Sequence, residues 1–89
     1  MAVEWGRHGI RVNCVCPGIT ATDITTGPTG MDSERLKARL QRVPLGRMGT
    51  AAEQADTIAF LASNEASYLS GLIMNNDGSQ LAVHSGVMV

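Results

Sequence analysis

Aromatic side chains and net charge are both scarce in this chain. Its 89 residues include one Trp, one Tyr and one Phe, and the formal net charge is -1. A core must therefore be built from Ala, Val, Ile, Leu and Met, and the near-neutral balance argues against a nucleic-acid or acidic-membrane partner. No apolar run approaches the ~18 residues that a membrane span needs.

A secretion signal is also missing from the first residues, Met-Ala-Val-Glu-Trp. They lack the basic segment followed by an apolar one that such a signal requires, so we expect a cytoplasmic protein. A chain of 89 residues forms at most one small domain. Domains of that size bury only about 60 to 65% of the surface that their unfolded chain exposes, which predicts marginal stability.

Cysteine is limited to Cys14 and Cys16. In an extended strand these side chains share one face about 6 to 7 Å apart, whereas a disulfide needs Cβ atoms about 4 Å apart. We therefore expect two free, buried thiols that act as small apolar residues. His8 and His84 show no ligand spacing with them, so no metal site is expected.

One apolar stretch, residues 10–16, organises the rest of the chain. It is rich in β-branched and thiol side chains, has no helical period and runs directly into Pro17-Gly18, which predicts a buried strand ended by a sharp turn. Ligands of open parallel sheets bind beyond the carboxyl ends of the strands, so residues 19–22 should face a ligand. Asn13, the polar residue of this strand, is expected to bond to a neighbouring backbone.

Helical patterns lie on both sides of a turn-rich segment. Residues 2–8 look like the end of a helix that Gly9 terminates in a left-handed conformation, and the Gly, Pro and Thr content of residues 23–31 predicts a mobile loop. A helix over residues 32–43 follows, ended by Pro44. Its basic residues fit a solvated face better than a nucleic-acid surface, because Asp32 and Glu34 are nearby.

A capping box, Thr50-Ala-Ala-Glu53, fixes the start of the next helix, predicted over residues 51–63. One stripe of this helix is apolar and should face the sheet, and further apolar side chains on other faces suggest a subunit interface. The stripe comprises Ala55, Ile58, Ala59 and Ala62, and the additional side chains are Phe60 and Leu61.

A second strand is predicted over residues 72–76, before a turn at Asp77-Gly78-Ser79. Strand, long helical connection and strand form the crossover unit of a parallel sheet, so this strand should lie beside that at residues 10–16. The expected class is α/β, with no internal repeat and no second domain.

Several sequence blocks occur together in an order that resembles the carboxyl-terminal third of a short-chain dehydrogenase/reductase. The resemblance covers residues 2 to about 79, nearly the whole chain. The blocks are Glu4 to Asn13, Cys16-Pro17-Gly18 with Thr22, Val43 to Arg47, Glu53, Phe60 to Ser63, Ser70-Gly71 and Asp77-Gly78.

The resemblance implies that residues 1–89 are a single partial domain, the C-terminal part of a doubly wound parallel sheet that binds NAD or NADP. Pro17, Gly18, Ile19 and Thr22 match the segment along the nicotinamide, where the backbone of Ile19 and the hydroxyl of Thr22 would hold the carboxamide. Residues 23–43 match the lid over a small-molecule substrate. The helix at 51–63 and the strand at 72–76 would form a homo-oligomer interface.

No catalytic residue is predicted in this chain. The family's phosphate-binding turn, active-site Ser and Tyr-x-x-x-Lys pair would all precede Met1, and Tyr68 is followed four residues later by Leu72 rather than Lys. We therefore expect a truncated fragment that is inactive by itself. Two alternatives stay open: a non-catalytic interaction module that uses an unpaired strand edge, and a chain that does not fold stably alone.

Overall fold

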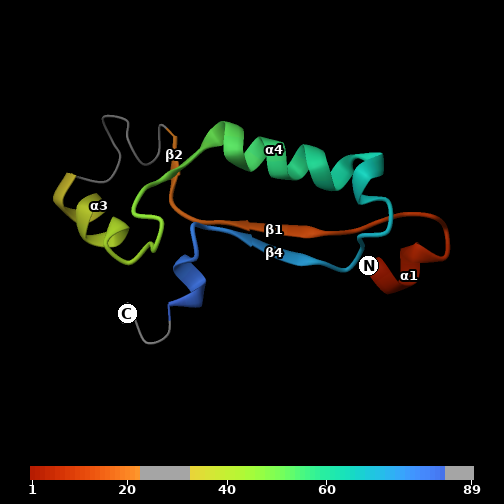
Figure 1. The fold of residues 1–89 in the computed structure, drawn as a ribbon. Coiled ribbons are helices and arrows are strands. Elements are labelled where there is room, and N and C mark those ends of the chain that lie inside the picture. Colours follow the sequence, from red (N-terminus) through yellow and green to blue (C-terminus); the bar gives the residue numbers. More distant parts are fainter. Residues whose placement is uncertain (23–32, 84–89) are drawn as a thin grey trace.

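The computed structural model describes residues 1–22 and 33–83, which form a short parallel strand pair with helices around it (Figure 1). The elements in chain order are α1 (Ala2–Gly6), β1 (Cys14–Pro17), β2 (Thr20–Ala21), α3 (Ser33–Leu40), β3 (Gly49–Thr50), α4 (Ala51–Ala62), the 3₁₀-helix η1 (Asn64–Ala66), β4 (Ile73–Asn76) and the 3₁₀-helix η2 (Gln80–Ala82).

The strands β1 and β4 pair in parallel, with Cys14 opposite Ile73 and Pro17 opposite Asn76. The connection between them contains α4, which lies along one side of the pair in Figure 1. This arrangement confirms the predicted crossover unit and the α/β class.

The first strand is shorter than predicted, because it begins at Cys14 rather than at residue 10. Residues before Cys14 bond to the loop that precedes β4 instead of extending the ladder: the Val12 N–H donates to Ser70 Oγ at 3.2 Å, and the Val12 carbonyl accepts the Gly71 N–H at 2.7 Å. The second strand begins at Ile73, one residue later than predicted.

A second, smaller strand pair was missed by sequence reasoning. Thr20 of β2 lies opposite Gly49 of β3, and Ala21 lies opposite Thr50. Two-residue strands are too short to carry an alternating pattern, so no sequence signal marks them. Since β3 leads directly into α4, this pairing ties the start of α4 to the loop after β1.

The helix α4 begins at the predicted capping box. Thr50 Oγ1 accepts the Glu53 N–H at 3.1 Å, and Glu53 Oε1 accepts the Thr50 N–H at 2.9 Å. The helix ends at Ala62, one residue before the predicted end, because Ser63 adopts an extended backbone and caps it.

The predicted apolar stripe of α4 is not buried against the sheet. Leu61 is the buried side chain of this helix, at 6% exposure, whereas Ile58 of the predicted stripe is 56% exposed. The inward face also carries Gln54 and Thr57, which bond to the polar end of β4 at Asn76. Hydrophobic periodicity could not reveal this face, since half of it is polar.

The core of the described residues is very small: Val43, Leu61 and Ala66 are the buried apolar side chains. Contrary to the prediction, β1 is not buried on both faces; Cys14 is exposed and Cys16 is half-buried. Both thiols are free, as predicted, although their Sγ atoms lie 3.9 Å apart. Within the described ranges β1 has one paired edge and one helix-covered face, which explains its exposure.

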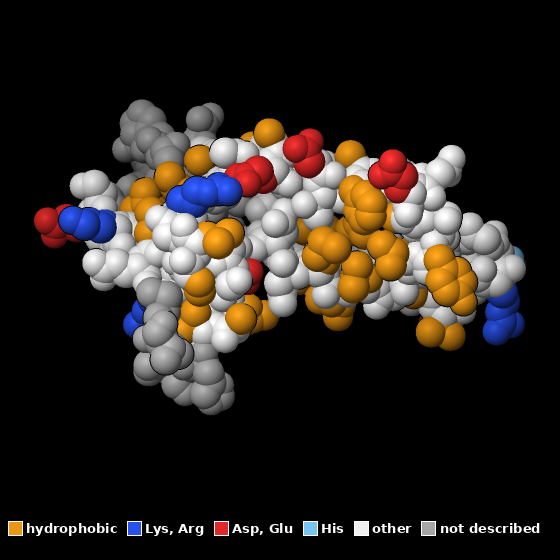
Figure 2. Space-filling view, in the orientation of Figure 1, with side chains coloured by type: hydrophobic (Ala, Val, Ile, Leu, Met, Phe, Trp, Pro, Cys, Tyr) orange, Lys and Arg blue, Asp and Glu red, His pale blue; other side chains and the backbone are white. Residues whose placement is uncertain are grey.

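Apolar surface is correspondingly abundant. Hydrophobic side chains gather below α4 and over the strand pair in Figure 2. The radius of gyration is 15.9 Å, against about 12 Å for a compact domain of this length. The exposed large apolar side chains include Val3, Trp5, Ile10, Ile58, Phe60 and Ile73.

The predicted helix over residues 32–43 is reduced to α3, Ser33–Leu40. The chain then turns and places Val43 in the core, where its Cγ1 lies 2.9 Å from the position that a Cβ on Gly78 would occupy. The expected loop at 23–31 and its neighbour Asp32 lie outside the described residues. Gly9 has a φ of +76°, which confirms the predicted left-handed turn after α1.

Neither a membrane-crossing helix nor a metal-binding group occurs in the described residues. Every described helix is too short or too polar to span a bilayer. No three His, Cys, Asp or Glu side chains of residues 1–22 and 33–83 gather closely enough to hold a metal ion. His84 lies outside these ranges.

Candidate functional site

The turn after β1 packs directly against the end of β4. Gly18 donates its N–H to the Asn76 carbonyl at 3.1 Å, and a Cβ at Gly18 would lie 2.7 Å from both Cα and Cβ of Asp77. No L side chain fits in that space, so the requirement for glycine is steric. This close contact directs residues 19–22 away from the strand pair.

The backbone of Ile19 offers both a donor and an acceptor. Its carbonyl accepts the Gly49 N–H at 2.9 Å, which leaves one lone pair, and its N–H makes no hydrogen bond to any described residue. Thr20 steadies the turn because its Oγ1 donates to the Gly18 carbonyl at 3.1 Å. The Gln54 amide in turn donates to Thr20 Oγ1 at 3.3 Å, which links the turn to α4.

All four predicted cofactor-binding residues line one open groove of about 590 Å³. That volume lies in the range of about 300 to 1,000 Å³ that is typical of small-molecule sites. The groove is lined by Pro17, Gly18, Ile19, Thr20, Thr22, Arg39, Arg42 and Gln80. The structure thus brings the predicted residues together, while their cofactor role stays a prediction.

Arg39, Arg42 and Gln80 also line the groove, and none of them was predicted to bind the cofactor. The resemblance placed the two arginines in the lid segment 23–43, whereas their charge was assigned to a solvated helix face. Tyr68 and Lys37 are the single tyrosine and the single lysine of the sequence. Neither lines this groove, and Tyr68 is 101% exposed.

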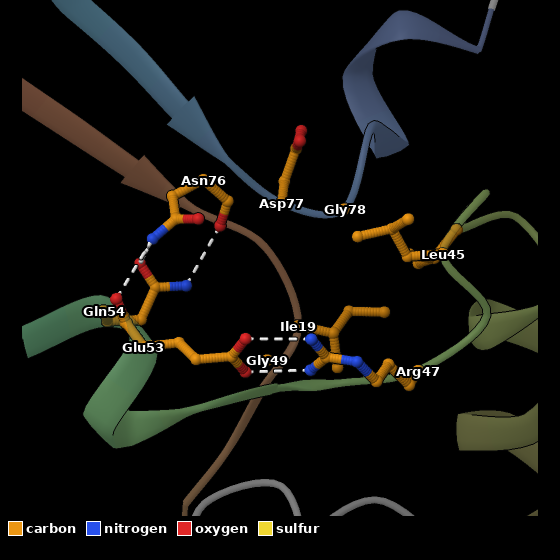
Figure 3. Close-up of a pocket in the computed structure, with 10 residues that line it drawn as sticks. Ile19, Leu45, Arg47, Gly49, Glu53, Gln54, Asn76, Asp77 and Gly78 are labelled. Carbon is orange, nitrogen blue, oxygen red and sulfur yellow. Dashed lines mark hydrogen bonds and ion pairs between the residues drawn. The ribbon is translucent and has the colours of Figure 1, made fainter. Parts of the chain in front are cut away.

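A second, much smaller pocket of about 60 Å³ lies behind the turn (Figure 3). Arg47 and Glu53 form a two-point ion pair at its side, with both N···O distances 2.8 Å. The hydrogen bonds from Arg47, together with that from the Thr50 N–H, lower the pKa of Glu53 from 4.5 to about 2. The pocket is too small for a substrate, so this pair stabilises the local fold.

An amide network joins α4 to the end of β4 in the same pocket (Figure 3). Asn76 Nδ2 donates to Gln54 Oε1 at 3.1 Å and to Thr57 Oγ1 at 2.8 Å, and Gln54 Nε2 donates to the Asn76 carbonyl at 3.0 Å. Asn76 thus gives the end of β4 a polar contact with α4. These contacts hold α4 in register with the turn after β1.

The opposite end of β1 is anchored by two polar side chains. Asn13 Nδ2 donates to the Leu69 carbonyl and Asn13 Oδ1 accepts the Leu72 N–H, both at 3.1 Å, which confirms its predicted structural role. The Arg11 guanidinium donates to the carbonyls of Leu61 at 2.7 Å and Ser63 at 3.2 Å. Arg11 therefore caps the end of α4, a role that the sequence did not suggest.

Similarity to known proteins covers almost the whole chain. A family model described as enoyl-(acyl carrier protein) reductase matches residues 1–79. The 3-oxoacyl-(acyl-carrier-protein) reductase of Chlamydia muridarum is 46% identical over 79 residues, which are 88% of this chain and 30% of that protein. The 2-dehydro-3-deoxy-D-gluconate 5-dehydrogenase of Escherichia coli is 39% identical over 82 residues, 92% of this chain and 32% of that protein.

Solved structures show the same fold. A short-chain dehydrogenase from Bacillus anthracis superposes with a TM-score of 0.74 at 42% identity, covering 94% of this chain and 30% of that one. A crystal structure described as a 2-deoxy-D-gluconate 3-dehydrogenase from Agrobacterium tumefaciens with bound NADP gives a TM-score of 0.83 at 41% identity, covering 92% and 33%.

The chain spans about a third of the length of these relatives. Its strand order, its Pro17-Gly18 turn and the family match over residues 1–79 agree with one another. The chain therefore belongs to the short-chain dehydrogenase/reductase family.

Proposed function

We propose that residues 1–89 form the cofactor-amide and substrate-lid portion of an NAD(P)-dependent short-chain oxidoreductase. The observation that carries this proposal is the convergence of Pro17, Gly18, Ile19 and Thr22 on one groove, where the Ile19 N–H has no partner among the described residues. A structural neighbour at 41% identity holds NADP, which supports this class of cofactor.

The hydrogen-bonding groups of Ile19 complement those of a nicotinamide carboxamide, which supports the proposal. A carboxamide presents one acceptor and two donor hydrogens, and Ile19 offers a donor N–H and a carbonyl with one unused lone pair. The missing Cβ of Gly18 lets the backbone pack tightly behind this position, so that the turn is held rigidly. The bound cofactor would supply the hydride, while Ile19 and Thr22 would hold the ring amide in one orientation.

The 89-residue chain alone should not catalyse hydride transfer. General acid catalysis needs a proton donor within hydrogen-bond reach of the reacting oxygen, and neither Tyr68 nor Lys37 lines the groove. Much of the affinity for a dinucleotide comes from phosphate contacts at a helix N-terminus, and no phosphate-binding Gly-rich turn occurs in these residues. The proposed role is therefore to position the cofactor and cover the substrate within a longer enzyme.

A dehydrogenase assay on the purified chain tests this role directly. With NADH or NADPH and a panel of small carbonyl compounds, we expect no turnover above the rate of the cofactor and substrate alone. Titration with either dinucleotide should show weak, saturable binding, and added nicotinamide should compete with the dinucleotide. Robust turnover, or dinucleotide binding that nicotinamide does not affect, would contradict the proposal.

The small core and exposed apolar surface favour a second candidate, a module that associates with another protein or a second copy. A groove of about 620 Å³ runs between β1 and α4, with Val15, Ile58, Leu61 and Ala62 in its walls. Within the described residues β1 pairs along one edge, with β4, so its other edge offers unpaired backbone groups to a further strand. Self-association through α4 and β4 would instead bury Phe60 and Ile73.

Light scattering over a range of chain concentrations distinguishes the two candidates. Association through apolar surface predicts a concentration-dependent mass that Ile58→Lys reduces, because a charged side chain would then face the interface. A monomer at high concentration with a cooperative thermal transition would count against the association candidate and leave the cofactor role as the better account.

A further inference from the structure

The groove at the turn after β1 carries concentrated positive charge. Arg39 extends into its lining from α3, and Arg42 does so from the turn that follows α3. The ion pairs in which both partners are described residues are Arg47 with Glu53 and the chain amino group with Glu4. Neither Arg39 nor Arg42 therefore has a carboxylate partner within residues 1–22 and 33–83.

No acidic side chain lines this groove among the described residues. Asp77 lines two other pockets instead, and its carboxylate accepts the backbone N–H groups of Ser79 at 3.1 Å and Leu81 at 2.9 Å. The rest of the lining is apolar or neutral, with the Gln80 amide as a further polar group. Among residues 1–22 and 33–83, two cations thus line a cavity that no carboxylate lines, in a chain whose net charge is -1.

Only some basic side chains of this region reach the groove. Arg39 in α3 and Arg42 in the turn after it line the groove, whereas Lys37 in α3 does not. If these side chains served only to solvate the helix, their positions would be unrelated to the turn after β1. Here two of them share a cavity with Pro17, Gly18 and Ile19, which a ligand can occupy.

We propose that this groove binds an oxyanion, a carboxylate or phosphate, through Arg39 and Arg42 while the rest of the ligand lies against Pro17 to Thr22. Guanidinium groups bind such anions through two parallel hydrogen bonds and stay charged at every physiological pH. The proposal rests on the proposed function, since it assigns the substrate of that enzyme to the class of anionic carbonyl or hydroxyl compounds. The same chemistry would also accept a phosphate of the dinucleotide itself.

Side-chain NMR of the arginines tests the proposal. The ¹⁵N-labelled 89-residue chain is titrated with acetoacetate, with its neutral methyl ester, and with nicotinamide mononucleotide. We expect acetoacetate to shift the Nε–Hε resonances of Arg39 and Arg42 in a saturable way, and the ester to leave them in place. Arg39→Gln and Arg42→Gln should each weaken acetoacetate binding about two- to fivefold, as expected for an exposed ion pair, whereas the matched control Lys37→Gln should not.

A competition experiment shows whether the bound anion belongs to the substrate or to the cofactor. If acetoacetate still shifts the arginines in the presence of saturating nicotinamide mononucleotide, the anion belongs to the substrate; if it is displaced, the anion is the cofactor's phosphate. The proposal would be overturned if acetoacetate and its ester shifted the arginine resonances equally, or if Lys37→Gln weakened acetoacetate binding as much as the arginine variants. It would also be overturned if the backbone amide resonances of β1 and β4 showed no chemical-shift dispersion, because the groove would then not be formed. Shifts at Arg39 and Arg42 without any effect of nicotinamide on the Ile19 amide would refute the cofactor role and retain the anion site.

Discussion

Gly18 and Asp77 lie backbone against backbone where β1 and β4 end, and a Cβ on Gly18 would be 2.7 Å from the Cα of Asp77. Gly18 does not have a positive φ, so its requirement is for space and not for a left-handed backbone. This contact joins the turn that carries the candidate site to the neighbouring strand. It makes Gly18 the first position at which the account can be tested.

Gly18→Ala should displace the turn from β4. A methyl group in this space forces the two backbones apart, at a cost of about 1 to 3 kcal/mol, and should abolish any nicotinamide-dependent signal from Ile19. Urea unfolding and nicotinamide titration measure the two effects. Gly6→Ala is the matched control, because nothing lies within 4 Å of its added methyl group. Equal stability of the two variants would contradict the steric account.

Asn13→Ala should loosen the other end of β1. The substitution removes the hydrogen bonds with Leu69 and Leu72. The Leu69 carbonyl keeps the Arg11 guanidinium as a donor, but the part-buried Leu72 N–H loses its acceptor, which costs about 1 to 3 kcal/mol. Denaturant unfolding and amide exchange at Leu72 report the loss. Asn75→Ala provides the comparison, since Asn75 is exposed on β4. A similarly small effect at both positions would show that Asn13 does not anchor the strand.

Leu61→Ala should be the most damaging truncation on α4. Leu61 is 6% exposed, and removal of a buried Leu side chain costs about 2 to 5 kcal/mol, enough to unfold a marginal domain. Ile58→Ala, at 56% exposure, should change the stability of the monomer by well under half as much. Thermal unfolding by circular dichroism compares them. A larger loss of stability in Ile58→Ala than in Leu61→Ala would contradict the burial of Leu61 and favour the apolar stripe predicted from periodicity.

The ion pair of Arg47 and Glu53 should make stability depend on acid pH. The pKa of Glu53 falls from 4.5 to about 2 on folding, so its stabilising effect is complete above about pH 4.5 and is lost as the pH falls toward 2. Thermal unfolding of the unmodified chain and Glu53→Gln should therefore differ most at neutral pH and converge in acid. Glu65→Gln, an exposed substitution in η1, serves as the control. A difference that is constant from pH 2 to 7 would contradict the assignment.

Local sequence signals located much of the fold. The capping box at Thr50 and Glu53, the left-handed Gly9, the strand ended by Pro17 and the structural role of Asn13 could all be inferred because each depends on near neighbours or on one residue's chemistry. The parallel crossover followed from the order of these elements.

Relationships across the fold could not be predicted in the same way. The inward face of α4 is half polar because Gln54 and Thr57 bond to Asn76, and no periodicity encodes partners that are 22 and 19 residues away. The prediction that β1 is buried on both faces was wrong. Burial of a strand depends on the helices and strands that pack against it, which its own composition does not specify. The resemblance assigned residues 23–43 to a lid, but charge patterning alone could not show that Arg39 and Arg42 line the same groove as the turn after β1.

The central claim is that the turn after β1 holds the nicotinamide carboxamide, and the Ile19 amide tests it most directly. The ¹⁵N-labelled chain is titrated with nicotinamide and, as a matched control, with nicotinic acid methyl ester, which lacks the amide hydrogens. The account predicts a saturable downfield shift of the Ile19 N–H with nicotinamide, a weaker one with the ester, and little change along β4. An Ile19 resonance that does not move, or that moves equally with both compounds, would contradict it.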